Sequence, residues 1–238
     1  MRLLQKHFRK ARLPLNTTSS PNSEITSSAQ GQAILLFPTV CFVVEHNDTV
    51  ELNEELKAFC LQEEKSAAGI QSGSIEGGYH SARQLFDSEN AAIQQLKKML
   101  LDDAKQYMTN YWKQESTTSL ESLGEFSMRM SGWSVILRQG NVSKPHTHPG
   151  AQLSGVYYVS TQEDQNSGGE LVLADPRIRA TVAPLVGQKS NAVFQPKSGI
   201  TVLFPSYLEH YVLPFRGSGE RISIAYNVMF SPNALQSN

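Results

Sequence analysis

The residues of this chain best suited to chemistry are three of its six histidines. His146 and His148 stand one residue apart in the stretch KPHTH, and His210 follows the stretch GITVLFPSYLE further along the chain. Side chains two residues apart on an extended segment point to the same face, so His146 and His148 are expected to project together. Neutral imidazole is a common ligand of iron, zinc, copper and nickel. The three histidines are therefore candidate metal ligands.

An arginine and a serine that follow the last of these histidines are also spaced so that their side chains would share one face of a strand. Arg221 and Ser223 begin the stretch RISIAYN, which reads as a strand, and side chains at i and i+2 of a strand share one face. Asn227 has the same parity and is a candidate to line the same pocket. Each piece is weak alone, and Arg221 could instead form a surface ion pair with Glu220. The ordered set His-x-His, His, Arg-x-Ser is the informative signal.

Two helices and a β-rich second half must position these residues. Apolar residues recur at helical spacing over 50–64 and 88–113, and Ser88 is a candidate N-cap for the second helix. After residue 125 short apolar runs of strand character alternate with Gly, Pro, Asn and Ser, which is typical of a β-sandwich or barrel. The sequence therefore predicts a mainly β domain over 32–238, with helices flanking an antiparallel core.

Composition limits the partners and the compartment. The net charge is −1, which gives no reason to expect nucleic acid, and the apolar runs are too short to span a membrane. The two cysteines, Cys41 and Cys60, fit a reducing compartment such as the cytoplasm. Residues 1–31 are basic and then rich in Ser and Thr, which predicts a flexible tail, with an organellar transit peptide as the alternative. Composition does not specify an oligomeric state.

The stretches PHTHPGAQLSGVYYV, SGGELVLADPR and GITVLFPSYLEHYVLPFRGSGERISIAYN together resemble the iron(II)- and 2-oxoglutarate-dependent oxygenases. The similarity extends over about residues 75–230 and is strongest to a subfamily that is widespread in bacteria and phages. It implies a double-stranded β-helix, also called a jelly roll and shared with the cupins, with helices packed outside it. It also implies an iron site at the open end of the roll.

The resemblance implies a role for each matching residue. His146 matches the first iron ligand and His210 the distal one, while Arg221 matches the residue that pairs with the C5 carboxylate of 2-oxoglutarate and Ser223 its hydroxyl partner. A guanidinium suits this role because its planar fork binds a carboxylate through two charge-assisted hydrogen bonds. The implied activity uses Fe(II), 2-oxoglutarate and O2 to hydroxylate an unidentified substrate, with release of succinate and CO2.

The two tyrosines of LSGVYYV are further candidates under the same resemblance. Tyr157 and Tyr158 follow the histidine pair on a predicted strand, so one of them must point inward and could donate a hydrogen bond to 2-oxoglutarate. The spacing from His146 favours Tyr157, while a core position is the alternative for either ring.

One position departs from the family. Most members carry His-x-Asp or His-x-Glu, whereas this chain has His148 at the carboxylate position. Three readings stay open: three histidines bind the iron, His146 and His210 bind it alone, or a carboxylate such as Asp175 comes from elsewhere. His148 is favoured as a ligand.

A cupin-type metalloenzyme is the rival interpretation. The stretch GNVSKPHTH fits the cupin spacing, and a three-histidine cupin can be a dioxygenase or isomerase that needs no 2-oxoglutarate, or a non-catalytic metal-binding roll. Arg221 and Ser223 separate the two, because only an enzyme that buries the C5 carboxylate has a general need to neutralise it.

Overall fold

The computed structural model describes residues 37–71, 73–115, 126–162, 164, 166–177 and 182–232, and these form one compact unit. The predicted tail, residues 1–31, lies outside the described residues. Neither described helix has an apolar stretch of the length that a bilayer crossing requires.

Two α-helices precede most of the strands. Helix α1 spans Val50–Ser66 and helix α2 spans Ala91–Glu115, against predicted ranges of 50–64 and 88–113. The N-cap of α2 is Asn90 rather than Ser88, because the Asn90 Oδ1 atom accepts the free N–H groups of the first turn at 3.0 and 3.2 Å. A 3-10 turn, η1, at Leu85–Asp87 leads into this cap.

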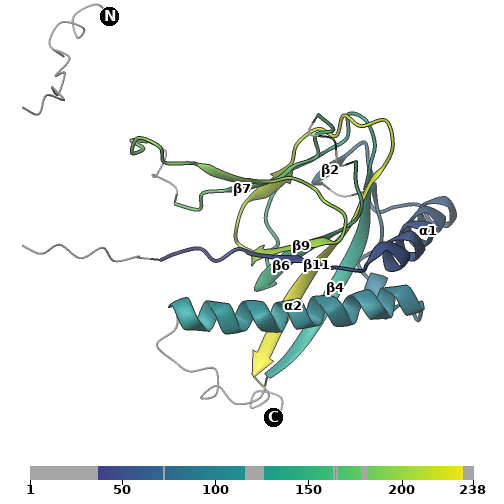
Figure 1. The fold of residues 1–238 in the computed structure, drawn as a ribbon, viewed down its shortest axis with the longest axis horizontal. Coiled ribbons are helices and arrows are strands. Elements are labelled where there is room, and N and C mark those ends of the chain that lie inside the picture. The colour runs from purple at the N-terminus through teal and green to yellow at the C-terminus, as the bar shows by residue number, and fades with distance from the viewer. Residues whose placement is uncertain are drawn as a thin grey trace, which may run out of the picture. The chain divides into compact units, whose positions relative to one another are not determined.

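Two antiparallel sheets make up the second half of the fold (Figure 1). The larger sheet has six strands in the order β1-β9-β6-β11-β4-β3, with bounds Phe42–Glu45, Ile200–Pro205, Leu153–Ser160, Arg221–Pro232, Phe126–Leu137 and Tyr79–His80. The smaller sheet has five strands in the order β2-β5-β10-β7-β8, with bounds Ile75–Glu76, Val142–His146, His210–Val212, Leu171–Ala174 and Asn191–Phe194.

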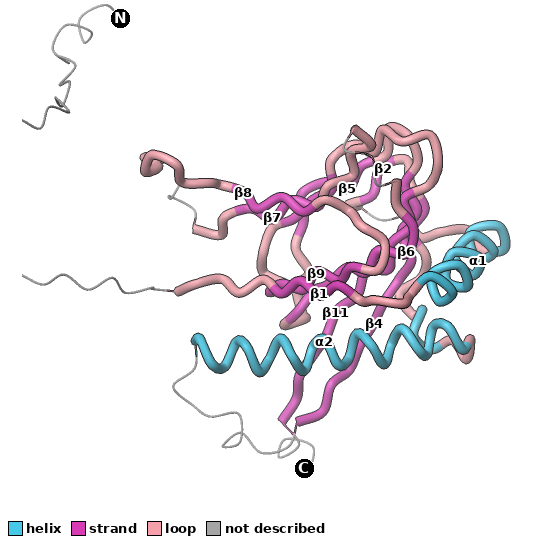
Figure 2. Tube along the Cα trace, viewed as in Figure 1, coloured by secondary structure: helices cyan, strands magenta, loops and turns pink. Residues whose placement is uncertain are grey.

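The chain passes back and forth between the two sheets from β4 to β11, which gives the double-stranded β-helix that the sequence predicts. Figure 2 shows the strands of the smaller sheet facing β9, β6 and β11 across the roll, with both helices on the other side of the larger sheet. The stretch 69–81, which reads as a Gly/Ser loop, contains the short strands β2 and β3. Two-residue strands are too short to leave a recognisable pattern in the sequence.

Strict alternation along the central strands separates the helix-covered core from the interior of the roll. On β11, Ile222 and Ile224 pack with the helices, whereas Arg221 and Ser223 face the other sheet. A second apolar cluster between the sheets contains Tyr158 and Phe204, and a third contains Trp133 and Phe215. Strand β11 therefore supplies apolar side chains to the helix-covered core and places Arg221 and Ser223 in the roll.

A buried side-chain hydrogen bond lies between α2 and the larger sheet. The Nε2 atom of His46 lies 2.9 Å from Oδ2 of Asp103 and 3.1 Å from the Thr201 hydroxyl, and the Asp103 side chain is only 2% exposed. A buried carboxylate is tolerated only when it is paired and hydrogen-bonded. Asp103 therefore anchors α2 to the edge of the sheet through His46.

We predict that Asp103→Ala lowers the free energy of unfolding by about 1–3 kcal/mol, because it leaves the half-buried His46 without its acceptor. The matched control is Asp102→Ala on the same helix. Asp102 pairs with Lys105 at 2.9 Å, but both side chains are more than half exposed, so its loss should cost less than about 0.5 kcal/mol. Urea denaturation of both variants measures the difference, and equal losses would contradict the anchoring role.

Candidate metal centre

Two short strands of the smaller sheet bring the distant histidines together. Strands β5 and β10 are antiparallel, and His210 lies directly opposite His146 in their register. The register shifts between His210 and Val212, as at a β-bulge. Bulges are common next to active sites because they redirect a side chain and fix the pairing. Cross-strand pairing thus places two imidazoles side by side although they are far apart in the sequence.

The third histidine lies beyond the end of β5. The backbone N–H of His148 donates to the carbonyl of Ser206 at 3.1 Å, which ties this loop to the end of β9. His146 and His148 therefore face the same site, as predicted, although only the first of them is on a strand.

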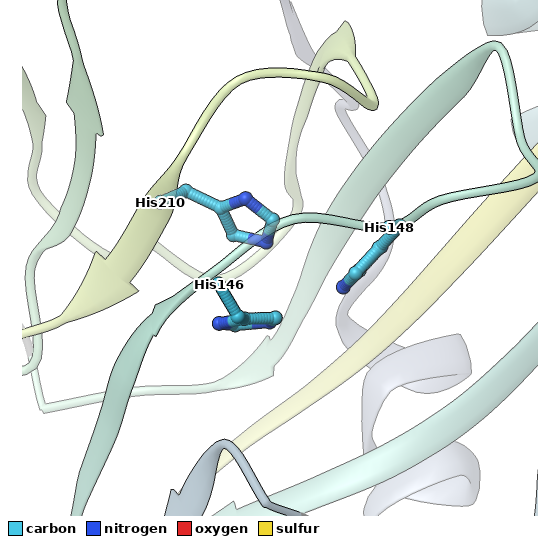
Figure 3. Close-up of side chains that lie close together, drawn as sticks. All are labelled: His146, His148 and His210. Carbon is cyan, nitrogen blue, oxygen red and sulfur yellow. The ribbon is translucent and has the colours of Figure 1, made fainter.

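The three imidazole rings converge on one space (Figure 3). One ligand nitrogen from each ring lies within 4.8 Å of the others, and the ring centroids are 4.3 to 5.1 Å apart. The structure therefore brings together all three histidines that the sequence singles out.

Each imidazole is held in place through its Nδ1 atom. His146 Nδ1 donates to the Lys144 carbonyl at 2.7 Å, and His210 Nδ1 donates to the Leu208 carbonyl at 2.9 Å. His148 Nδ1 lies 2.7 Å from Oδ1 of Asn227. A donor hydrogen at Nδ1 leaves the Nε2 lone pair free, which is the arrangement found for histidines that bind metals.

Burial keeps these imidazoles neutral. It lowers the pKa of His148 to about 4 and that of His210 to about 3, and it also lowers the pKa of His146 below its usual value. Neighbouring positive charge, including that of the Arg83 guanidinium, lowers the pKa of His148 further. All three rings are therefore available as ligands near neutral pH.

Arg221 and Ser223 point from β11 into the same pocket. Arg221 is 1% exposed; its Nε donates to the Gly169 carbonyl at 3.0 Å and its Nη1 to the Ser223 hydroxyl at 3.1 Å. No carboxylate among the described residues lies within ion-pair distance of it. Gly169 has a φ of 76°, and a Cβ there would lie 2.9 Å from Arg221 Cδ, so the approach requires glycine.

The two tyrosines point to opposite sides of the larger sheet. The Tyr157 hydroxyl donates to Asn53 Oδ1 at 2.7 Å, on the side covered by the helices, which is at odds with the cosubstrate contact predicted for it. Tyr158 points into the roll, where the Arg221 guanidinium lies 5.0 Å from its ring centre. Tyr158, not Tyr157, has the parity of His146, so a period of two counted from His146 indicates the ring that faces the roll.

Asn227 lies behind His148 rather than on the pocket wall. Its Oδ1 atom also accepts from the Ser154 hydroxyl at 2.9 Å, and that hydroxyl lies 2.8 Å from the Ser206 hydroxyl. These bonds fix the amide that orients His148. Asp175, the alternative carboxylate ligand, is instead paired with Arg177 at 2.6 Å.

Three further residues border the site, and sequence reasoning did not assign them to it. Trp133 is a core residue, 4% exposed, whose ring centroid also lies 5.5 Å from that of His148. His80 stacks on the same indole at 5.4 Å, and the Arg83 guanidinium lies 5.3 Å from its centre. The alternation of side chains along β4 predicts that Trp133 points inward. No spacing in the sequence predicts that His80 and Arg83 contact its indole.

One pocket of about 350 Å³ is lined by the three histidines, Arg221 and Ser223, together with His80, Arg83 and Trp133. Three neutral nitrogen donors with hydrogen-bonded Nδ1 atoms suit a divalent transition metal such as iron. The buried guanidinium suits a carboxylate, because a buried charge without a counterion is costly. The residues therefore fit an iron ion and a dicarboxylate cosubstrate held between the histidines and Arg221.

We predict that Asn227→Ala lowers the affinity for a divalent metal about 10- to 100-fold, because the His148 ring loses its orienting acceptor. Isothermal titration with Ni(II) or Fe(II) under argon measures this change. The control is Asn110→Ala, which removes an exposed amide on α2 and should leave the affinity unchanged. An unchanged affinity in Asn227→Ala would mean that His148 does not depend on this bond.

Comparison with known proteins agrees with this geometry. Residues 131–227 match the family described as "Putative 2OG-Fe(II) oxygenase". None of the curated protein sequences matches the chain.

Solved structures of similar fold come from several organisms. A prolyl-4-hydroxylase from Pseudomonas putida is 17% identical with a TM-score of 0.55, over 79% of this chain and 91% of that one. A prolyl hydroxylase from Trichoplax adhaerens, in complex with a peptide fragment of hypoxia inducible factor, is 16% identical with a TM-score of 0.54, over 83% and 87%. HygX from Streptomyces hygroscopicus, with nickel and 2-oxoglutarate bound, is 13% identical with a TM-score of 0.53, over 82% and 84%.

At these identities the likeness to solved structures shows the fold alone. The matched segment 131–227 contains His146, His148, His210, Arg221 and Ser223, so the part of the chain that carries the site is similar to the 2OG-Fe(II) oxygenase family.

Proposed function

We propose that this oxygenase binds Fe(II) through His146, His148 and His210 and binds the C5 carboxylate of 2-oxoglutarate through Arg221 and Ser223. In this reading it hydroxylates a substrate with O2 and releases succinate and CO2. The observation that carries the proposal is a fully buried arginine without a carboxylate partner, in the pocket that holds three converging imidazoles.

The free-energy cost of burying the Arg221 charge without a counterion argues for a dianionic cosubstrate. Arg221 donates to a carbonyl and a hydroxyl, neither of which neutralises its charge. A carboxylate can supply a bidentate, charge-assisted pair in a site from which water is excluded. Ser223 holds the guanidinium fork at Nη1, so the direction from which a carboxylate must approach is fixed in advance.

The iron and cosubstrate would supply the oxidising chemistry, and the chain's own residues would supply binding and orientation. Neutral imidazoles need no deprotonation before they bind a cation. The Nδ1 bonds to the Lys144 and Leu208 carbonyls hold His146 and His210 in the binding tautomer. Phe204, Trp133 and Leu171 line the pocket and limit the access of water.

The two cysteines are free thiols, which supports a cytoplasmic location for the enzyme.

Anaerobic titration with Fe(II) and then 2-oxoglutarate tests this function directly. We expect a weak visible metal-to-ligand charge-transfer band with saturable dependence on 2-oxoglutarate. Binding of iron without the band would contradict the proposal and favour a cupin-type metal site that does not use 2-oxoglutarate.

We predict that Arg221→Gln weakens 2-oxoglutarate binding by about 100-fold, because a carboxylate loses its charge-assisted partner. Because Arg221 is buried and its loss could impair folding, Ser223→Ala is a milder second variant, with an expected loss of about 5- to 10-fold. Arg129→Gln is the control, since Arg129 is exposed and lies outside the pocket. Wild-type affinity in a folded Arg221→Gln protein would exclude the assigned role.

Variants of His148 separate the three-histidine site from a two-histidine site. We expect His148→Ala to lose Fe(II) affinity at least 10-fold, whereas His148→Asp should retain the metal because a carboxylate is also an iron ligand. Fe(II) affinity is measured by calorimetry under argon. If His148→Ala binds iron as tightly as the wild type, His146 and His210 hold the ion without it.

A further inference from the structure

A second arginine lines the pocket. It is Arg83, which lies between β3 and α2 in the sequence, far from Arg221. Arg83 follows β3, and its backbone is fixed to β4, because the Arg83 carbonyl accepts the N–H of Gly132 at 3.3 Å. Its guanidinium lies over the indole of Trp133, which His80 contacts by parallel stacking with an interplanar angle of 9°. The arginine is therefore carried on a rigid aromatic platform that also touches His148.

Arg83 has no counterion within the described part of the chain. It is exposed, lines the pocket, and takes part in no ion pair with a described residue. The described residues that line this pocket include two arginines and no Asp or Glu. An arginine stacked on tryptophan keeps its N–H groups directed outward for a planar oxyanion.

The charge of the loaded site favours an anionic substrate, an argument that depends on the proposed function. Iron(II) contributes two positive charges and the two arginines one each, while 2-oxoglutarate contributes two negative charges. With an imidazole at His148 in place of the family's carboxylate, no Asp or Glu lines the pocket to offset the remaining two positive charges, and Glu170, outside the lining, acts on Arg221 alone of the two arginines. In a pocket with apolar walls this excess attracts an anion strongly.

The other residues that line the pocket indicate the character and size of the rest of the ligand. Ile75, Leu137 and Trp133 give apolar surface to the same pocket of about 350 Å³, and of these Trp133 lies next to the guanidinium. This space also has to hold the cosubstrate, so only a small group or the end of a larger molecule fits.

We propose that Arg83 and the Trp133 platform form a subsite for the prime substrate, which is a molecule with an apolar segment and a terminal oxyanion. The oxyanion binds the Arg83 guanidinium, and the apolar segment lies on Trp133, near the three histidines. Arg83 is thus a specificity-determining residue that is separate from the cosubstrate arginine, Arg221.

Calorimetric titration of protein loaded with Ni(II) and saturating 2-oxoglutarate tests this subsite. Nickel avoids turnover, and bound 2-oxoglutarate prevents the probe from occupying the Arg221 site. The probes are 3-phenylpropionate, its uncharged analogue 3-phenylpropionamide, and phenyl phosphate, at pH 7.5 and low salt. We expect the oxyanions to bind at least 10-fold more tightly than the amide.

The variants isolate the contribution of Arg83. In Arg83→Gln the preference for the oxyanions over the amide should fall at least 10-fold, and Arg83→Lys should keep part of it because the charge remains but the planar fork is lost. Arg129→Gln, which removes an exposed arginine outside the pocket, should bind as the wild type does. Comparison of 3-phenylpropionate with phenyl phosphate shows whether the larger dependence on Arg83 is for a carboxylate or for a phosphate.

Three results would overturn the subsite: a wild type that does not prefer the oxyanions, a wild type that binds none of the probes, or an unchanged preference in Arg83→Gln. The loading step keeps this failure separate from failure of the proposed function. If Ni(II) and 2-oxoglutarate bind normally and the oxyanion preference is absent, only the subsite is refuted. If 2-oxoglutarate itself does not bind, the proposed function fails first.

Discussion

The alternation of side chains along β11 is the constraint on which the rest of this structure depends. Consecutive residues of this one strand serve two different environments, because Ile222 and Ile224 complete the core under the helices while Arg221 and Ser223 face the roll. The strand pairs with β4 on one side and β6 on the other, so its register fixes both neighbours. If the register of β11 shifted by one residue, Arg221 and Ser223 would point into the apolar core, and Ile222 and Ile224 would point into the pocket.

Much of the site could be predicted from the sequence because its residues lie on strands with a period of two. His146, His210, Arg221 and Ser223 fall where strand spacing and family resemblance place them. Prediction failed for Tyr157, which does not share the parity of His146 and whose hydroxyl bonds Asn53 on α1. Contacts between separate elements have no local pattern in the sequence.

The fold was predictable at the level of architecture for the same reason. Long helices and long strands such as β11 carry many repeats of their period, whereas β2, β3 and β10 have only two or three residues and gain their structure from tertiary pairing. The cap of α2 is Asn90 rather than the predicted Ser88. Both residue types serve this role, and only the backbone geometry decides between them.

The pairing of His210 with His146 across β5 and β10 has a mechanical consequence. Strand β10 is three residues long and has few hydrogen bonds with which to resist sliding along its neighbour. An ion shared by the two opposite imidazoles would cross-link these strands at the mouth of the roll, since sliding by one residue would turn one ring away from the ion. Metal loading would then stabilise the pairing of β5 with β10, and the stiffness of this part of the smaller sheet would depend on the cell's supply of iron.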